Sequence, residues 1–188
     1  MKSLLIAIVL LLSGVTTQPT TKPGDAPKIT YRLSDGSEDW PADKREQIVA
    51  AMDEAVAMYN EHTNLSHELR VSYVPSVPTA DANRNGHIRF GKQIGSRTAL
   101  HEIAHTFGIG TTRRWREMLD NGVYTGSAAD LVKQWDGDTA VLKGDRMHFW
   151  PYGLNYDRED GPERRIRHVK LVEAIVKDMD EKRATQKG

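Results

Sequence analysis

The chain has 188 residues, and its 26 Lys and Arg balance its 26 Asp and Glu, so the formal net charge at pH 7 is zero. This balance excludes the strong basic footprint of a nucleic-acid-binding protein, and we expect no nucleic-acid partner. A hydrophobic share of 38% and a charged share of 28% are typical of a globular protein with a buried core. The absence of cysteine excludes disulfide bonds.

The N-terminal residues have the pattern of an export signal. In residues 1–17, Lys2 precedes an apolar run at 4–12, and small residues follow. The run is short for a membrane span, so we expect a secreted protein, extracellular or periplasmic, with no membrane anchor after signal removal. Residues 18–27 are rich in Thr, Pro and Gly and are expected to form a flexible lead-in. Residues 28–188 would then form a single domain.

Strand and helix patterns follow one another in the first half of this domain. Alternating residues predict strands at 28–33 and 68–75, and a helical repeat of apolar residues begins after Pro41. Residues 79–86 are polar and predict a turn that leads into a third strand at 87–91. This short strand suits the edge of a sheet, where it would either pair with an extended peptide or simply end the sheet.

The segment that follows carries the chemistry. His101-Glu102-Ile103-Ala104-His105 lies on a predicted helix that ends at Gly108, and two histidines four positions apart project from one helix face. Their imidazoles can therefore bind one metal ion, with Glu102 beside it. Zinc lowers the pKa of a bound water to roughly 7, and a neighbouring glutamate can take the proton as that water attacks a carbonyl. We predict Zn²⁺ as the cofactor, His101 and His105 as ligands and Glu102 as the general base.

The pattern becomes less regular after Gly110. Short helices are predicted at 113–119 and 127–135, where Trp115 and Trp135 would pack this part together. Four aromatic residues and one histidine lie within 147–156. A long final helix begins at Pro162. Its expected buried face consists of Ile166, Val169, Val172, Ile175, Val176 and Met179.

This order of elements resembles the zincin metallopeptidases from the first strand to the last helix. The resemblance implies an α+β fold in which a small twisted mixed sheet packs on an N-terminal helix and on the active-site helix. An irregular lower subdomain would follow and end in a C-terminal helix. The motif ending at Gly108 looks like the metzincin branch, and Met147 is similar to the methionine turn that lies beneath the metal in that branch. By the same resemblance, Tyr152 or Tyr156 is a candidate donor to an oxyanion, although both could equally be packing residues.

One position departs from the metzincin pattern. Metzincins place a third histidine ligand three residues after the glycine, whereas this chain has Thr111, whose neutral hydroxyl is a poor zinc ligand. We rank His148 first as the replacement ligand, Glu117 second and Asp120 third. The alternative for His148 is a histidine hydrogen-bonded within an aromatic wall.

We therefore predict a secreted, monomeric zinc metalloendopeptidase that acts on a protein or peptide substrate. One alternative is a binding protein that keeps the zincin fold without catalysis. Thr111 favours this alternative and Glu102 opposes it, because a metal site that only binds needs no base. The other alternative is a zinc amidase that uses the same activated water on a non-peptide substrate.

Overall fold

The computed structural model describes residues 29–185 and has a mixed α+β fold. The predicted signal at 1–17 and lead-in at 18–27 lie outside the described residues. Within the described range, no helix has the length and apolar character needed to cross a bilayer. The elements in chain order are β1 (Ile29–Leu33), η1 (Ser37–Asp39), α1 (Ala42–His62), β2 (His67–Tyr73), β3 (Ala80–Asn83), β4 (His87–Phe90), α2 (Ser96–Thr106), α3 (Arg113–Glu117), β5 (Leu119–Asp120), β6 (Val123–Tyr124), α4 (Ala129–Asp136), β7 (Lys143–Gly144), β8 (Phe149–Trp150), η2 (Asp157–Glu159) and α5 (Pro162–Thr185).

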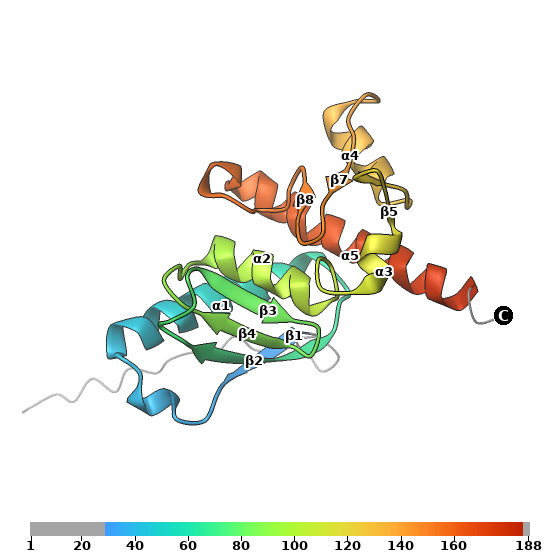
Figure 1. The fold of residues 1–188 in the computed structure, drawn as a ribbon. Helices are drawn as coiled ribbons and strands as arrows, with labels where there is room; N and C mark the ends of the chain where they lie inside the picture. Colours follow the sequence, from blue (N-terminus) through green and yellow to red (C-terminus); the bar gives the residue numbers. More distant parts are fainter. Residues whose placement is uncertain (1–28, 186–188) are drawn as a thin grey trace, which may run out of the picture.

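The main sheet has the strand order β1-β2-β4-β3. The first three of these strands run parallel, and β3 runs antiparallel to β4 at the edge. Helices α1 and α2 lie together above the sheet, and α5 crosses above them (Figure 1). Val71 of β2 pairs with Ile88 of β4, and both side chains are fully buried beneath the helices. The sheet therefore fixes α2 over its edge strand.

The main sheet contains one correction to the sequence prediction. Residues 79–86 were expected to form a turn, but Ala80–Asn83 form β3, so that β4 is an interior strand and β3 is the edge. Alanine, aspartate and asparagine have weak strand propensities, which hides this strand in the sequence. Cross-strand pairing stabilises it instead, because the Arg89 guanidinium donates to both carboxylate oxygens of Asp81 at 2.7 and 2.6 Å.

The long helices follow the predicted repeats closely. Ile48, Met52, Ala55 and Tyr59 are buried along one face of α1. Most of the predicted face of α5 is buried too, although Ile166 and Val176 are only partly covered. The buried residues of α5 are His168, Val169, Leu171, Val172, Ile175, Asp178 and Met179. Two polar side chains thus enter the core from α5.

The C-terminal part is built around a second, antiparallel sheet with the order β5-β6-β7-β8. Trp115 of α3 is fully buried, and its ring lies against the rings of Tyr124 and Phe149. Trp135 of α4 packs against the same core. The prediction that these two tryptophans hold this part together is confirmed.

Candidate metal and active site

Helix α2 presents His101 and His105 on one face, with their Nε2 atoms 3.1 Å apart. Each ring donates its Nδ1 proton to a backbone carbonyl, His101 to Gly153 at 2.7 Å and His105 to Ile109 at 2.8 Å. A neutral imidazole has one N–H, so the two Nε2 lone pairs face each other. Burial holds the pKa of His101 well below its usual value and also lowers the pKa of His105. Protonation therefore does not relieve the contact, whereas an electron-pair acceptor between the two nitrogens would.

A short loop at 152–154 aligns this helix through its backbone. The Tyr152 carbonyl accepts a hydrogen bond from His168 Nδ1 at 2.7 Å, and the Gly153 carbonyl accepts one from His101 Nδ1 at 2.7 Å. The Leu154 carbonyl accepts one from an Arg97 guanidinium nitrogen at 2.6 Å. The first and third residues of the loop have left-handed backbone angles, with φ of 66° and 54°. Because side chains other than glycine rarely adopt this conformation, the loop is held in a strained shape that aims its carbonyls at α2 and α5.

The glutamate of the motif is buried without a full set of partners. Glu102 is 5% exposed, and its Oε2 atom has no hydrogen-bond partner. Burial, followed by the negative charge of Asp81, raises the pKa of this carboxyl to about 8. Within residues 29–185 only one other buried side-chain atom lacks a partner, the Oδ1 of Asn155. Its amide nitrogen is fixed by donation to the Phe149 carbonyl and to Glu159, both at 3.0 Å.

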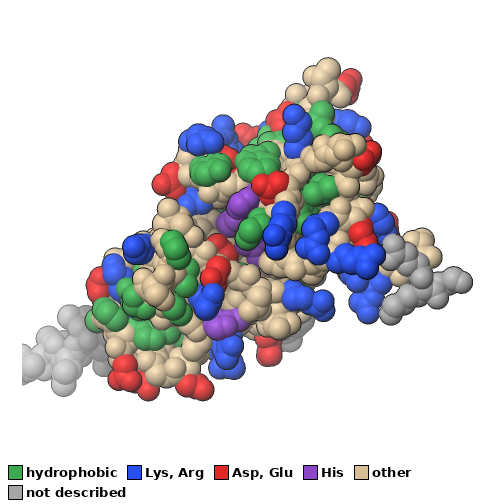
Figure 2. Space-filling view, viewed as in Figure 1, with side chains coloured by type: hydrophobic (Ala, Val, Ile, Leu, Met, Phe, Trp, Pro, Cys, Tyr) green, Lys and Arg blue, Asp and Glu red, His purple; other side chains and the backbone are tan. Residues whose placement is uncertain are grey.

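These groups line one pocket of about 250 Å³. One wall comes from the edge strand β3 through Ala80–Ala82, and another from α2 through Arg97, His101, Glu102 and His105. Figure 2 shows histidine side chains in a hollow across the middle of this face of the molecule. Both unpartnered oxygens, of Glu102 and Asn155, belong to residues that line this pocket. The pocket therefore offers acceptor atoms that await a proton donor or a cation.

His148, the first-ranked third ligand, lines the same pocket. Its ring is stacked over that of His101 with the centroids 5.7 Å apart, and its Nδ1 lies 3.5 Å from an Asp145 carboxylate oxygen. In this arrangement no three His, Cys, Asp or Glu side chains of the described residues form a group that could hold a metal ion. Thr111 lines the pocket too, but its hydroxyl donates to the His105 carbonyl at 2.9 Å. Met147 is 49% exposed at the pocket, rather than buried beneath the histidines.

The two carboxylates that ranked lower lie elsewhere. Glu117 accepts a hydrogen bond from Arg113 at 2.6 Å and lines a separate hollow beside the end of α2. Asp120 accepts from the Asn121 amide at 3.0 Å. Neither residue lines the pocket that holds His101.

The candidate oxyanion donors also point away from the histidine pair. The Tyr152 hydroxyl donates to Asp136 at 2.6 Å and is further bonded by Arg167. Tyr156 is 47% exposed, and the Arg158 guanidinium lies 4.4 Å from the centre of its ring. Neither tyrosine lines the histidine pocket, and only the backbone of the 152–154 loop takes part in the site.

Arg97, Asp81 and Asn155 are among the residues of the pocket that were not predicted from the sequence. Arg97 precedes His101 by four positions on α2, so helical spacing alone places it on the same face. Asp81 lies in strand β3, whose residues have the pattern of a turn, so the sequence gives no sign that it faces a pocket. Asn155 had no such signal, because a loop of irregular backbone angles brings it to the pocket.

The histidine pair fits two of the ligand positions of a zinc ion. Two imidazole nitrogens with free lone pairs suit Zn²⁺, and the Nδ1 donations to carbonyls are the supporting bonds that orient such ligands. Glu102 supplies an acceptor beside the pair without being needed as a ligand. Comparison of the chain with protein-family models, with curated proteins and with solved structures found no match.

Proposed function

We propose that the protein is a secreted zinc-dependent metallopeptidase of the zincin type. The observation that carries this proposal is the pair of Nε2 lone pairs of His101 and His105, which face each other across 3.1 Å with the unpartnered Glu102 carboxyl in the same pocket. Without a cation the two facing lone pairs repel each other, whereas a cation between them could bind both. The order of strands and helices, with an antiparallel edge strand beside α2, supports the resemblance to the zincins that the sequence motif suggests.

His101, His105 and His148 would hold the zinc. The His148 side chain is 36% exposed and is held by a 3.5 Å contact to Asp145 and by ring contacts with His101 and Trp150, which a side-chain rotation would exchange for the metal. Glu117 and Asp120 rank lower because neither lines the pocket. When bound, the zinc would supply an electrophilic centre that acidifies water and polarises a carbonyl.

The protein's own residues would then act on the substrate as follows. Glu102 takes the proton of the attacking water and passes it to the leaving amine. A cation between the histidines favours the carboxylate form of Glu102 and so restores a base at neutral pH. An extended peptide can pair with the free edge of β3, whose residues Ala80–Ala82 line the pocket. The Asn155 Oδ1 atom can accept a substrate N–H.

Two other functions use the same pocket. A binding protein would hold zinc through the same histidines, but it would have no use for a buried carboxyl whose burial disfavours its charged form. A zinc amidase would share every catalytic residue and differ only in the substrate. The strand edge beside the pocket favours a peptide over a compact amide.

The test is metal analysis of the purified mature chain combined with cleavage of fluorescently labelled casein. We expect about one zinc per chain, cleavage that a chelator abolishes, and recovery when zinc is restored. Zinc-loaded protein that leaves casein and a panel of small amides and esters intact would establish the binding-protein alternative. Cleavage of amides alone would establish the amidase.

A further inference from the structure

Trp150 occupies an unusual place among the four tryptophans. Trp115 is fully buried, and Trp40 and Trp135 pack against the core. Trp150 is half-buried, does not belong to that packed set, and its Nε1 proton finds no acceptor among residues 29–185. By contrast, the Trp115 Nε1 atom donates to the Asp145 carbonyl at 2.9 Å. A large indole held outside the core with a free donor is available to a ligand.

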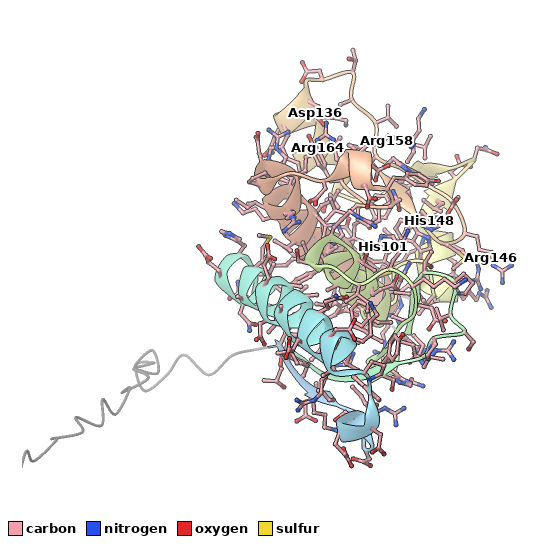
Figure 3. The ribbon with its side chains drawn as sticks, turned by 90° about the vertical axis from the view of Figure 1, so that its left-hand side faces the viewer. His101, Asp136, Arg146, His148, Arg158 and Arg164 are labelled. Carbon is pink, nitrogen blue, oxygen red and sulfur yellow. The ribbon has the colours of Figure 1, made fainter. Side chains whose placement is uncertain are left out.

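The ring of Trp150 forms one wall of a second pocket, of about 640 Å³. Tyr152 extends this aromatic wall, and Val141 and Pro151 add further apolar surface. The charged residues of the lining are Asp136, Lys143, Glu159 and Arg164. In Figure 3, Asp136 and Arg164 lie together in the upper part of the view, above His148 and His101. The pocket therefore combines aromatic surface with charges of both signs.

Several of the charged groups retain hydrogen-bonding capacity. Lys143 forms no ion pair with any described carboxylate. Arg164 uses one guanidinium nitrogen, which donates to the Arg158 carbonyl at 2.7 Å. Glu159 uses only Oε2, which accepts from Asn155. Donors and acceptors thus remain free around the aromatic wall.

This second pocket adjoins the histidine pocket through Trp150. The Trp150 and His148 rings lie 5.8 Å apart, and His148 lines the pocket that contains His101 and Glu102. The contact between these two rings therefore joins a lining residue of one pocket to a lining residue of the other.

The chemistry of the lining selects among ligand classes. An apolar side chain would desolvate four charged residues without bonding them. An anion could pair with Lys143 and Arg164 but would also face the carboxylates of Asp136 and Glu159, so the charges of the lining cancel and do not favour it. Peptide pairing with β8 is restricted because the Phe149 carbonyl already accepts from Asn155. A sugar ring offers an apolar C–H face for an aromatic wall and a rim of hydroxyls that both donate and accept.

We propose that the pocket beside Trp150 is a subsite for an uncharged pyranose ring of a glycan. Resting on the proposed peptidase function, this makes the substrate a glycosylated peptide or protein, with the sugar on Trp150 and the scissile bond at the histidine pair.

The test is calorimetric titration of the chelator-treated Glu102→Gln chain with cellotetraose, chitotetraose, mannotetraose and maltotetraose at millimolar concentration. We expect saturable binding of at least one of them. Trp150→Ala should weaken that binding at least about tenfold, and Trp150→Phe should restore part of it, because a smaller ring remains. Lys143→Met should also weaken binding, whereas Trp40→Phe, at a tryptophan outside the pocket, should leave it unchanged.

The outcomes separate the subsite from the catalytic proposal. Failure of all four sugars to bind, or equal binding by the parent, Trp150→Ala and Lys143→Met, overturns the subsite even if casein is cleaved. Sugar binding that depends on Trp150 in a chain that cleaves nothing upholds the subsite and removes the peptidase. If Trp150→Ala fails to fold, Trp150→Phe and Lys143→Met decide the matter by themselves.

Discussion

Replacement of Glu102 by glutamine should make the metal-free protein more stable as well as inactive. The carboxyl has a pKa of about 8 when folded, against 4.5 as the reference for the unfolded chain. The folded state therefore binds this proton more tightly than the unfolded state does. It follows that the stability contribution is fully present below pH 4.5 and is lost as the pH rises towards 8. Glutamine has nearly the same shape and does not titrate, so it escapes this loss.

The magnitude follows from the pKa difference. At pH 7 the unfolded carboxyl is 2.5 units above its pKa, while the buried one is still mostly protonated. At about 1.4 kcal/mol per unit, the metal-free parent loses about 3 kcal/mol of unfolding free energy relative to acid pH. A protonated carboxyl carries one donor and a carboxamide two, so the substitution adds one buried N–H, whose cost is the same at both pH values. The unfolding free energy of Glu102→Gln should therefore gain about 3 kcal/mol on that of the parent between pH 4.5 and pH 7.

The assay is urea unfolding of both chains in chelator at the two pH values, followed by the same measurement with zinc. Zinc stabilises the carboxylate form of Glu102, so it should reduce the difference in unfolding free energy between the parent and the variant at pH 7. Turnover of the zinc-loaded variant should fall by ~10²–10⁴, as expected for loss of a general base. A stability difference between the metal-free chains that is the same at both pH values would refute the raised pKa, and parental turnover in the variant would refute the role of Glu102 as base.

Three further changes test other parts of the site. His148→Ala should lower zinc affinity by more than the roughly 10–100-fold that follows loss of a residue supporting a ligand. Glu117→Ala should leave the zinc content unchanged, and metal analysis after dialysis measures both effects. Burial lowers the pKa of His168 from 6.5 to about 4, so the folded state resists protonation of this ring. The unfolding free energy therefore falls by about 3 kcal/mol as the pH falls through this range. Urea unfolding of chelator-treated parent and His168→Gln should show that this loss is absent from the variant. Gly110→Ala places a methyl group 2.1 Å from a neighbouring backbone oxygen at φ +73°, whereas Gly137→Ala meets open space at φ +96°. We expect about 1–3 kcal/mol more destabilisation at Gly110 by thermal or urea unfolding, and equal losses at both glycines would refute the close contact.

The sequence predicts the helices well because their signal is periodic and local. The buried faces of α1 and α5 follow from apolar residues at helical spacing, and so does the common face of His101 and His105. His168 lies four positions before Val172 on the predicted buried face of α5, so the same spacing could have identified it. Its polarity concealed it, although it is fully buried.

The remainder depends on contacts between distant segments. Strand β3 is stabilised by pairing with β4 and by the ion pair of Asp81 with Arg89, neither of which has a local signal. The sequence offers Tyr152 as a candidate oxyanion donor or a packing residue, and in the structure its hydroxyl bonds Asp136 while the backbone of its loop bonds His101. Asn155 enters the pocket only because that backbone turns left-handed on either side of Gly153. No periodicity encodes such a turn in residues other than glycine.

The use of carbonyl groups at 152–154 has a consequence for how this site varies during evolution. A peptide carbonyl is the same in every residue, so the polar contacts of this loop do not depend on which side chains it carries. The loop itself is constrained by packing, because Gly153 has no room for a Cβ and Leu154 is fully buried. The chemical constraint falls on the three donors, Arg97, His101 and His168, which lie on two helices far apart in the sequence. Homologous chains would therefore share these spaced donors together with a glycine at the centre of the loop. Joint retention of Arg97 and His168 with the two histidines of α2 is the signature by which such chains could be recognised.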